Sequence, residues 1–123
     1  MPLRYIKYRR AAHYRTDFRS EDWGPYLVLL EIDDQRAMRQ VNIHESGQVL
    51  RYDRSHWCDD YGHMAAGKFS RKPKAASLGQ GEFIDAAEFE QQWKLALKSP
   101  LWTEQLLDSR EREWGTWAQR QGE

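Results

Sequence analysis

The chain has 123 residues, with 19 basic and 19 acidic side chains, one cysteine and an apolar fraction of 40%. The zero net charge gives no general attraction to nucleic acid or to an anionic membrane, and the single Cys58 excludes an internal disulfide. No apolar run approaches the roughly 18 residues that span a bilayer, and the first residues lack the apolar stretch of a signal peptide. We therefore expect one cytoplasmic domain, with a core rich in aromatic side chains.

Strand patterns dominate the N-terminal half of the chain. The segments with strand composition or alternation are residues 4–9, 26–33, 39–44 and 48–53. The run 26–33 is the most hydrophobic and is expected at the centre of the sheet, while Val41 and Ile43 share one side of their strand. Gly47 accepts the positive φ that a tight turn requires. The pattern predicts an antiparallel meander of three to four strands within about residues 4–53.

A long segment without periodicity follows, over residues 54–81. It contains several glycines, a proline and a block of four basic residues: Lys68, Arg71, Lys72 and Lys74. Loops of this length in compact domains are usually functional or disordered. We therefore expect this loop, together with the sheet face away from the helices, to form the working surface.

The C-terminal part predicts two helices within about residues 85–114. Asp85 and Glu88 have the spacing of a capping box, and Ile84 and Phe89 that of a hydrophobic staple, which indicates a helix over 85–98. The apolar stripe of this helix is Phe89, Trp93, Ala96 and Leu97. Pro100, preceded by Ser99 as cap, begins the second helix. The expected fold class is thus α+β, with the meander packed on a C-terminal helix.

Several of these segments together resemble a family of small bacterial proteins that is known only as a domain of unknown function. The segments that carry the likeness are 5–7, 29–34, 39–41, 47–52 and 84–93, so it covers about residues 5–93. The extension from Ser99 has no counterpart in that family. The resemblance implies the fold and a bacterial source, and it transfers no catalytic residue.

The densest group of reactive side chains lies between His56 and His63, where Cys58 and two aspartates intervene. These residue types bind zinc, and a histidine next to a thiol serves nucleophilic catalysis, but the spacing matches no known zinc arrangement and no glycine-rich elbow surrounds the thiol. We therefore predict no metal and no catalytic residue here. The favoured alternative is that Trp57 and Tyr61 anchor the loop on the sheet while its polar residues face water.

The first strand offers a second kind of site. Tyr8, Arg9 and Arg10 lie in a run where basic and aromatic residues interleave, which suits phosphates and unpaired bases, and Lys68, Arg71 and Lys72 would extend the footprint. Basic residues also simply keep an edge strand from pairing with another molecule. Nucleic-acid binding is therefore our alternative hypothesis.

Charge patterning favours binding to another protein. Residues 1–20 carry six basic and one acidic side chain, 21–65 carry four and nine, 66–80 four and none, and 81–123 five and nine. Alternating blocks of this kind suit a charged protein partner, as in bacterial immunity proteins, and the tail tryptophans either join the core or support a homodimer. Phosphate-loop, serine-elbow and metalloprotease motifs are not found. We expect a non-catalytic binding protein without a cofactor, with these candidate binding residues: Tyr8, Arg9, Arg10, Trp57, Tyr61, Lys68, Arg71 and Lys72.

Overall fold

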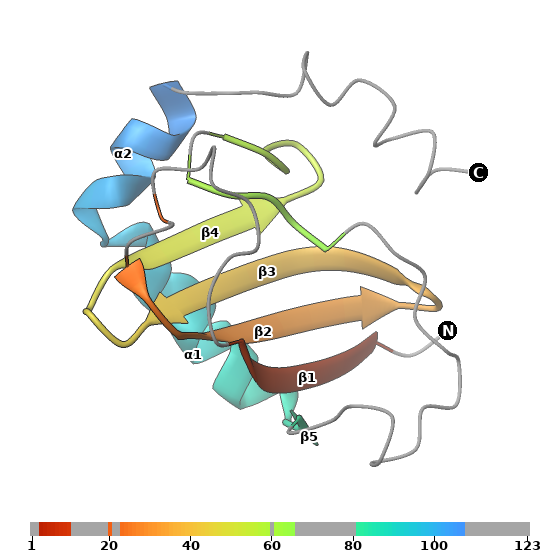
Figure 1. Ribbon diagram of the computed structural model, residues 1–123. Helices are drawn as coiled ribbons and strands as arrows, with labels where there is room; N and C mark the ends of the chain where they lie inside the picture. The colour runs from red at the N-terminus through yellow and green to blue at the C-terminus, as the bar shows by residue number, and fades with distance from the viewer. Residues whose placement is uncertain (1–2, 11–19, 21–22, 60, 66–80, 108–123) are drawn as a thin grey trace.

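The computed structural model describes residues 3–10, 20, 23–59, 61–65 and 81–107. The elements in chain order are β1 (Leu3–Arg10), β2 (Tyr26–Asp33), β3 (Arg36–His44), β4 (Val49–Asp53), β5 (Glu82–Phe83), α1 (Ala86–Leu97) and α2 (Pro100–Leu107). The strands form one antiparallel sheet in the order β4-β3-β2-β1-β5, with the helices following it in the chain (Figure 1). The predicted α+β class and meander are confirmed, and β5 is a fifth strand that the sequence did not indicate.

Short turns set the register of the meander. Asp34, in the left-handed region at φ 56°, connects β2 to β3, and aspartate is one of the residues that tolerates this conformation. Gly47, at φ 103°, connects β3 to β4, as predicted. β2 lies at the centre of the sheet and is buried on both faces, which also confirms the prediction for its hydrophobic run.

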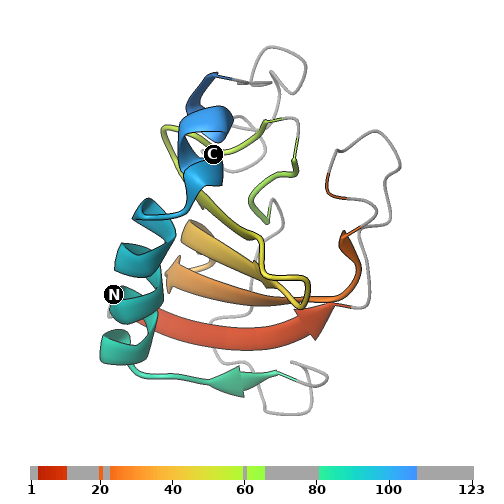
Figure 2. The same cartoon turned by 90° about the vertical axis from the view of Figure 1, so that its left-hand side faces the viewer.

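The two faces of the sheet are covered by different parts of the chain. We call the face that packs against α1 the helix side, and the face under residues 56–59 and 61–65 the loop side; Figure 2 shows them on opposite sides of the sheet. The buried core of the helix side is Leu29, Val41, Phe89, Trp93 and Ala96. The loop side is larger, with this buried core: Ile6, Tyr26, Val28, Leu30, Ile32, Ala37, Leu50, Tyr52, Trp57, Cys58, Tyr61 and Met64.

Helix α1 begins where the sequence placed it. The backbone N–H of Glu88 donates to the Asp85 carboxylate at 2.8 Å, and Ile84 packs on the cluster that contains Phe89. The Glu88 side chain binds Lys7 of β1 at 2.8 Å. Leu97 was wrongly assigned to the apolar stripe, since 47% of it is exposed. It lies one residue beyond Ala96, and a helix rotates by about 100° per residue, which turns Leu97 away from the sheet.

A buried amide joins helix α2 to β4 and to the loop. Gln105 is fully buried; its Oε1 accepts from the backbone N–H of Arg51 at 3.2 Å, and its Nε2 donates to the Arg51 carbonyl at 2.8 Å. The predicted continuation of helix toward residue 114 lies outside the described residues. Neither of the two helices described here has the length and apolar character needed to cross a bilayer.

Candidate functional site

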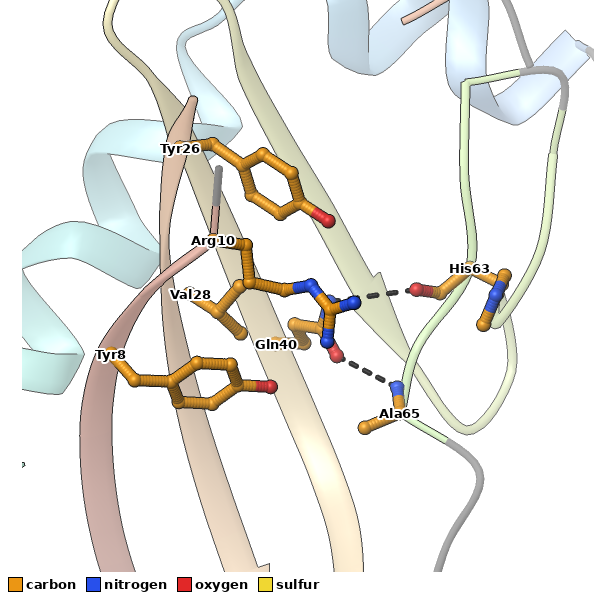
Figure 3. A pocket seen from close by; sticks show the side chains of 7 residues that line it. All are labelled: Tyr8, Arg10, Tyr26, Val28, Gln40, His63 and Ala65. Carbon is orange, nitrogen blue, oxygen red and sulfur yellow. Dashed lines mark hydrogen bonds between the residues drawn. The ribbon is translucent and has the colours of Figure 1, made fainter. Parts of the chain in front are cut away.

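A small pocket opens on the loop side between β1, β2, β3 and residues 63–65. It has a volume of about 60 Å³ and is lined by Tyr8, Arg10, Tyr26, Val28, Gln40, His63 and Ala65. Pairing across β1 and β2 sets Arg10 opposite Tyr26 and Tyr8 opposite Val28. Figure 3 shows the side chains of Tyr8, Arg10 and Tyr26 extending from the strands toward the loop. The pocket therefore places one guanidinium between two phenols.

The charge of Arg10 differs from that of its neighbours in how it is compensated. Lys7 pairs with Glu88 at 2.8 Å and Glu82 at 3.2 Å, and Arg9 pairs with Glu45 at 2.9 Å. In the part of the chain that the structure describes, no carboxylate forms an ion pair with Arg10. The pocket thus contains a positive charge that a ligand can neutralise.

The phenol of Tyr8 remains a hydrogen-bond donor at neutral pH. Burial raises its pKa above the ordinary value of 10.0, because the charged phenolate loses its hydration, and the nearby Arg10 opposes this shift. A protonated phenol and a guanidinium both donate hydrogen bonds. Donors of this kind, arranged around a volume that holds a few water-sized groups, suit a small anionic group such as a carboxylate.

The wall of the pocket formed by the loop is pinned by Gln40. Its Nε2 donates to Asn42 Oδ1 at 2.8 Å and to the His63 carbonyl at 3.5 Å, and its Oε1 accepts from the Ala65 backbone N–H at 2.8 Å. Gln40 is 4% exposed, so these bonds are shielded from water. The amide consequently positions the wall of the pocket and leaves charge recognition to Arg10.

Asp59 organises the rest of the loop. This fully buried carboxylate accepts five hydrogen bonds. The donors are Tyr52 Oη at 2.9 Å, Tyr61 N at 2.8 Å, Gly62 N at 3.2 Å, His56 Nε2 at 2.9 Å and Gln105 Nε2 at 3.0 Å. A buried charge that is fully hydrogen-bonded is tolerated, and here it ties the loop, β4 and α2 together.

The predicted binding residues lie in different parts of the structure. Tyr8 and Arg10 meet in the pocket, whereas Arg9 lies on the helix side in its pair with Glu45. Trp57 and Tyr61 are 6% and 1% exposed and pack in the loop-side core, so they anchor the loop. The binding candidates of the basic block, Lys68, Arg71 and Lys72, lie outside the described residues.

The predicted exposure of the loop's polar residues is wrong, because His56 and Asp59 are buried together with Cys58. Among the described side chains, no three histidines, cysteines or carboxylates come together as a metal-ligand set. The thiol of Cys58 lies 4.0 Å from the Asp59 carbonyl, inside the core.

Sequence reasoning missed Tyr26, Gln40, His63 and Ala65 as lining of the pocket. Tyr26 lies in a strand that was assigned to the core, and it is indeed 4% exposed. Gln40 alternates with Val41, and alternation indicates which residues share a face without indicating what covers that face. The one available indication was the long loop itself, which contributes His63 and Ala65.

Comparisons with known proteins leave the resemblance found in the sequence as an expectation. No family model matches the chain, and neither the curated proteins nor the solved structures include a similar one.

Proposed function

We propose that the protein is a non-catalytic binding module. It binds a partner protein that inserts one of its own carboxylates into the pocket beside Arg10. The observation that carries this proposal is the Arg10 guanidinium, which has no carboxylate partner among the described residues and lies between two phenols. A single guanidinium matches the single negative charge of an aspartate, a glutamate or a chain terminus.

The compensated charges of β1 favour a protein over nucleic acid as the partner. A strand that follows a phosphodiester backbone needs several cations free to release counterions. Lys7 and Arg9 are each paired with glutamates of this chain, and Arg4 donates to the Asp34 carbonyl at the other end of the strand. Arg10 is thus the one cation of β1 that lines the pocket. One carboxylate in a pocket of about 60 Å³ requires no such row of cations.

The alternating charge blocks support a role of the immunity or regulatory type. Some of these charges are used inside the sheet, as the pairs of Lys7 and Arg39 show. The remaining charges would speed the encounter with an oppositely charged partner, while Arg10 would supply the specific contact.

The test is affinity capture from lysate of the native host, with and without nuclease, using the tagged protein and two variants. Arg10→Gln should weaken capture of a stoichiometric protein at least about tenfold, because the charge-assisted hydrogen bond from the guanidinium to the partner's carboxylate is lost. Arg9→Gln is the matched control, since its exposed ion pair lies on the opposite face and contributes little.

Two results would count against the proposal. Equal capture by the Arg10 and Arg9 variants would show that the interface lies away from the pocket. Captured material that disappears with nuclease would support the nucleic-acid alternative instead.

A further inference from the structure

A second site can be derived from the position of one proton in the Asp59 network. Of the five donors to Asp59, the backbone N–H groups of Tyr61 and Gly62 have no lone pair to offer, so they can only donate. Gln105 Nε2 can also only donate, because the N–H and carbonyl of Arg51 fix the orientation of this amide. Asp59 therefore accepts hydrogen bonds from three groups that can only donate.

The acceptor role of Asp59 determines which nitrogen of His56 carries the proton. A carboxylate is an acceptor only, so His56 Nε2, 2.9 Å from Asp59 Oδ2, must be the N–H nitrogen. In the neutral imidazole, Nδ1 then has a lone pair. None of the described residues forms a hydrogen bond with Nδ1, although His56 is 6% exposed. His56 is thus a nearly buried base whose second nitrogen is unoccupied.

The unoccupied nitrogen belongs to a side chain that borders a groove. The groove has a volume of about 480 Å³ and lies between the turn after β4 and helix α2. Its lining is Asp53, Arg54, Ser55, His56, Trp57, Trp102 and Leu106. Small-molecule sites usually measure roughly 300–1,000 Å³ and combine apolar walls with a few fixed polar groups. The groove has both, because Trp57, Trp102 and Leu106 supply the apolar part.

The imidazole is also held in orientation. It stacks on the Tyr52 ring, with 6.1 Å between centroids and 6° between planes, and meets the Trp102 ring edge-on at 5.6 Å. Asp59 fixes its remaining rotation. A base whose tautomer and direction are set before binding offers a ligand an acceptor at a defined place.

We propose that this groove binds a small neutral ligand that has an aromatic ring and an O–H or N–H group. The O–H or N–H donates to His56 Nδ1, and the ring packs on Trp102 and Leu106. Asp59 acts as a positioning residue, since it holds the tautomer without touching the ligand. This site is separate from the Arg10 pocket, with which it shares no lining residue.

The test uses phenol and anisole as matched probes, because both have the same ring and only phenol has a proton to donate. In ¹⁵N-detected NMR of the histidine-labelled protein, His56 should show a protonated Nε2 and an unprotonated Nδ1. Phenol should bind at least about tenfold more tightly than anisole and shift the Nδ1 resonance of His56. The ring of His44, which lies in the core beside Tyr26, serves as the internal control and should not respond.

Equal affinities for phenol and anisole, or a proton on Nδ1, would overturn the proposal. His56→Phe keeps a ring in the groove and should abolish the difference between the two probes. Because the comparison of probes is made on the unaltered protein, it remains decisive even where this variant fails to fold.

Discussion

Charges on the helix side of the sheet are matched with opposite charges, whereas the carboxylate buried on the loop side is surrounded by hydrogen-bond donors from several kinds of group. On the helix side, Arg39 binds Glu31 at 2.8 Å and also Glu90, and its guanidinium lies 5.0 Å from the rings of Phe89 and Trp93. On the loop side, the neighbours of Asp59 are phenol, amide, imidazole and backbone groups. The helix side thus resembles an ion-pair network at a surface, and the loop side a structured polar core.

Arg51 departs from this division. It lies on β4, is 9% exposed and stacks on Trp93 at 3.6 Å and on Trp102 at 4.9 Å, without an ion pair in the described part of the chain. Desolvation lowers its pKa, and Asp53 on the same strand opposes the shift. The planar guanidinium suits this position between two indoles, because it stacks on aromatic faces and is more weakly hydrated than an ammonium.

The largest expected effect of a single substitution is on the loop side. Asp59→Ala removes the acceptor of five buried hydrogen bonds, and we expect it to lower the free energy of unfolding by about 5 kcal/mol, the upper end for a broken buried pair. Urea denaturation followed by tryptophan fluorescence measures this. Asp59→Asn, which keeps the shape and part of the acceptor capacity, should cost less. A loss below about 1 kcal/mol for the alanine variant would show that the network does not hold the loop.

On the helix side, packing should matter more than any one ion pair. Phe89 of α1 is fully buried against the sheet, where the Arg39 guanidinium of β3 lies over its ring, and Phe89→Ala should lower the free energy of unfolding by about 3 kcal/mol. Leu97→Ala, in the last turn of the same helix, should change it by less than about 0.5 kcal/mol because the side chain is already half exposed. Urea denaturation measures both variants. Similar losses in the free energy of unfolding would contradict the described orientation of α1.

Acid should weaken the two sides in different pH ranges. Burial lowers the pKa of His44 on the loop side below its ordinary 6.5, so the unfolded chain binds the proton more readily, and stability falls as the pH drops below about 6.5. The hydrogen bond from Arg39 lowers the pKa of Glu90, so the stability from this pair is present above the ordinary glutamate pKa and is lost only in stronger acid.

Two variants separate these ranges in a series of urea titrations from pH 7 to pH 3. His44→Gln should flatten the change in stability between pH 7 and pH 5. Glu90→Gln should flatten only the part below pH 4.5, by less than about 1 kcal/mol, because the carboxylate is 40% exposed. If His44→Gln changed the stability below pH 4.5, or Glu90→Gln changed it between pH 7 and pH 5, the assignment of these pH ranges to the two groups would be wrong.

The elements that sequence reasoning predicted are those with local causes. The central strand follows from a hydrophobic run, the turn at Gly47 from a residue that tolerates positive φ, and α1 from the cap at Asp85. Strand β5 has only two residues, Glu82 and Phe83, which is too short for any periodicity to appear. It pairs with β1 because the chain passes there on its way to α1.

The candidate site was predicted only in part, for a similar reason. Tyr8 and Arg10 stood out by their own chemistry, while Gln40 and Tyr26 gain their place from contacts with distant residues. The loop's polar residues were expected in water because no local pattern indicates that Asp59 meets Tyr52 and Gln105. Contacts between side chains that are far apart in the sequence cannot be predicted from the spacing of residues along it.

The position of β5 beside β1 bears on how the protein is made. During synthesis, β1 leaves the ribosome before β2, and β3 and β4 then follow β2 after short turns, so these four strands can pair as they emerge. The outer backbone of β1 at Ile6 and Lys7 pairs with Phe83 and Glu82 only after most of the chain has been translated. Until then this strand presents an unpaired edge, which is the kind of surface on which a strand of another chain can pair.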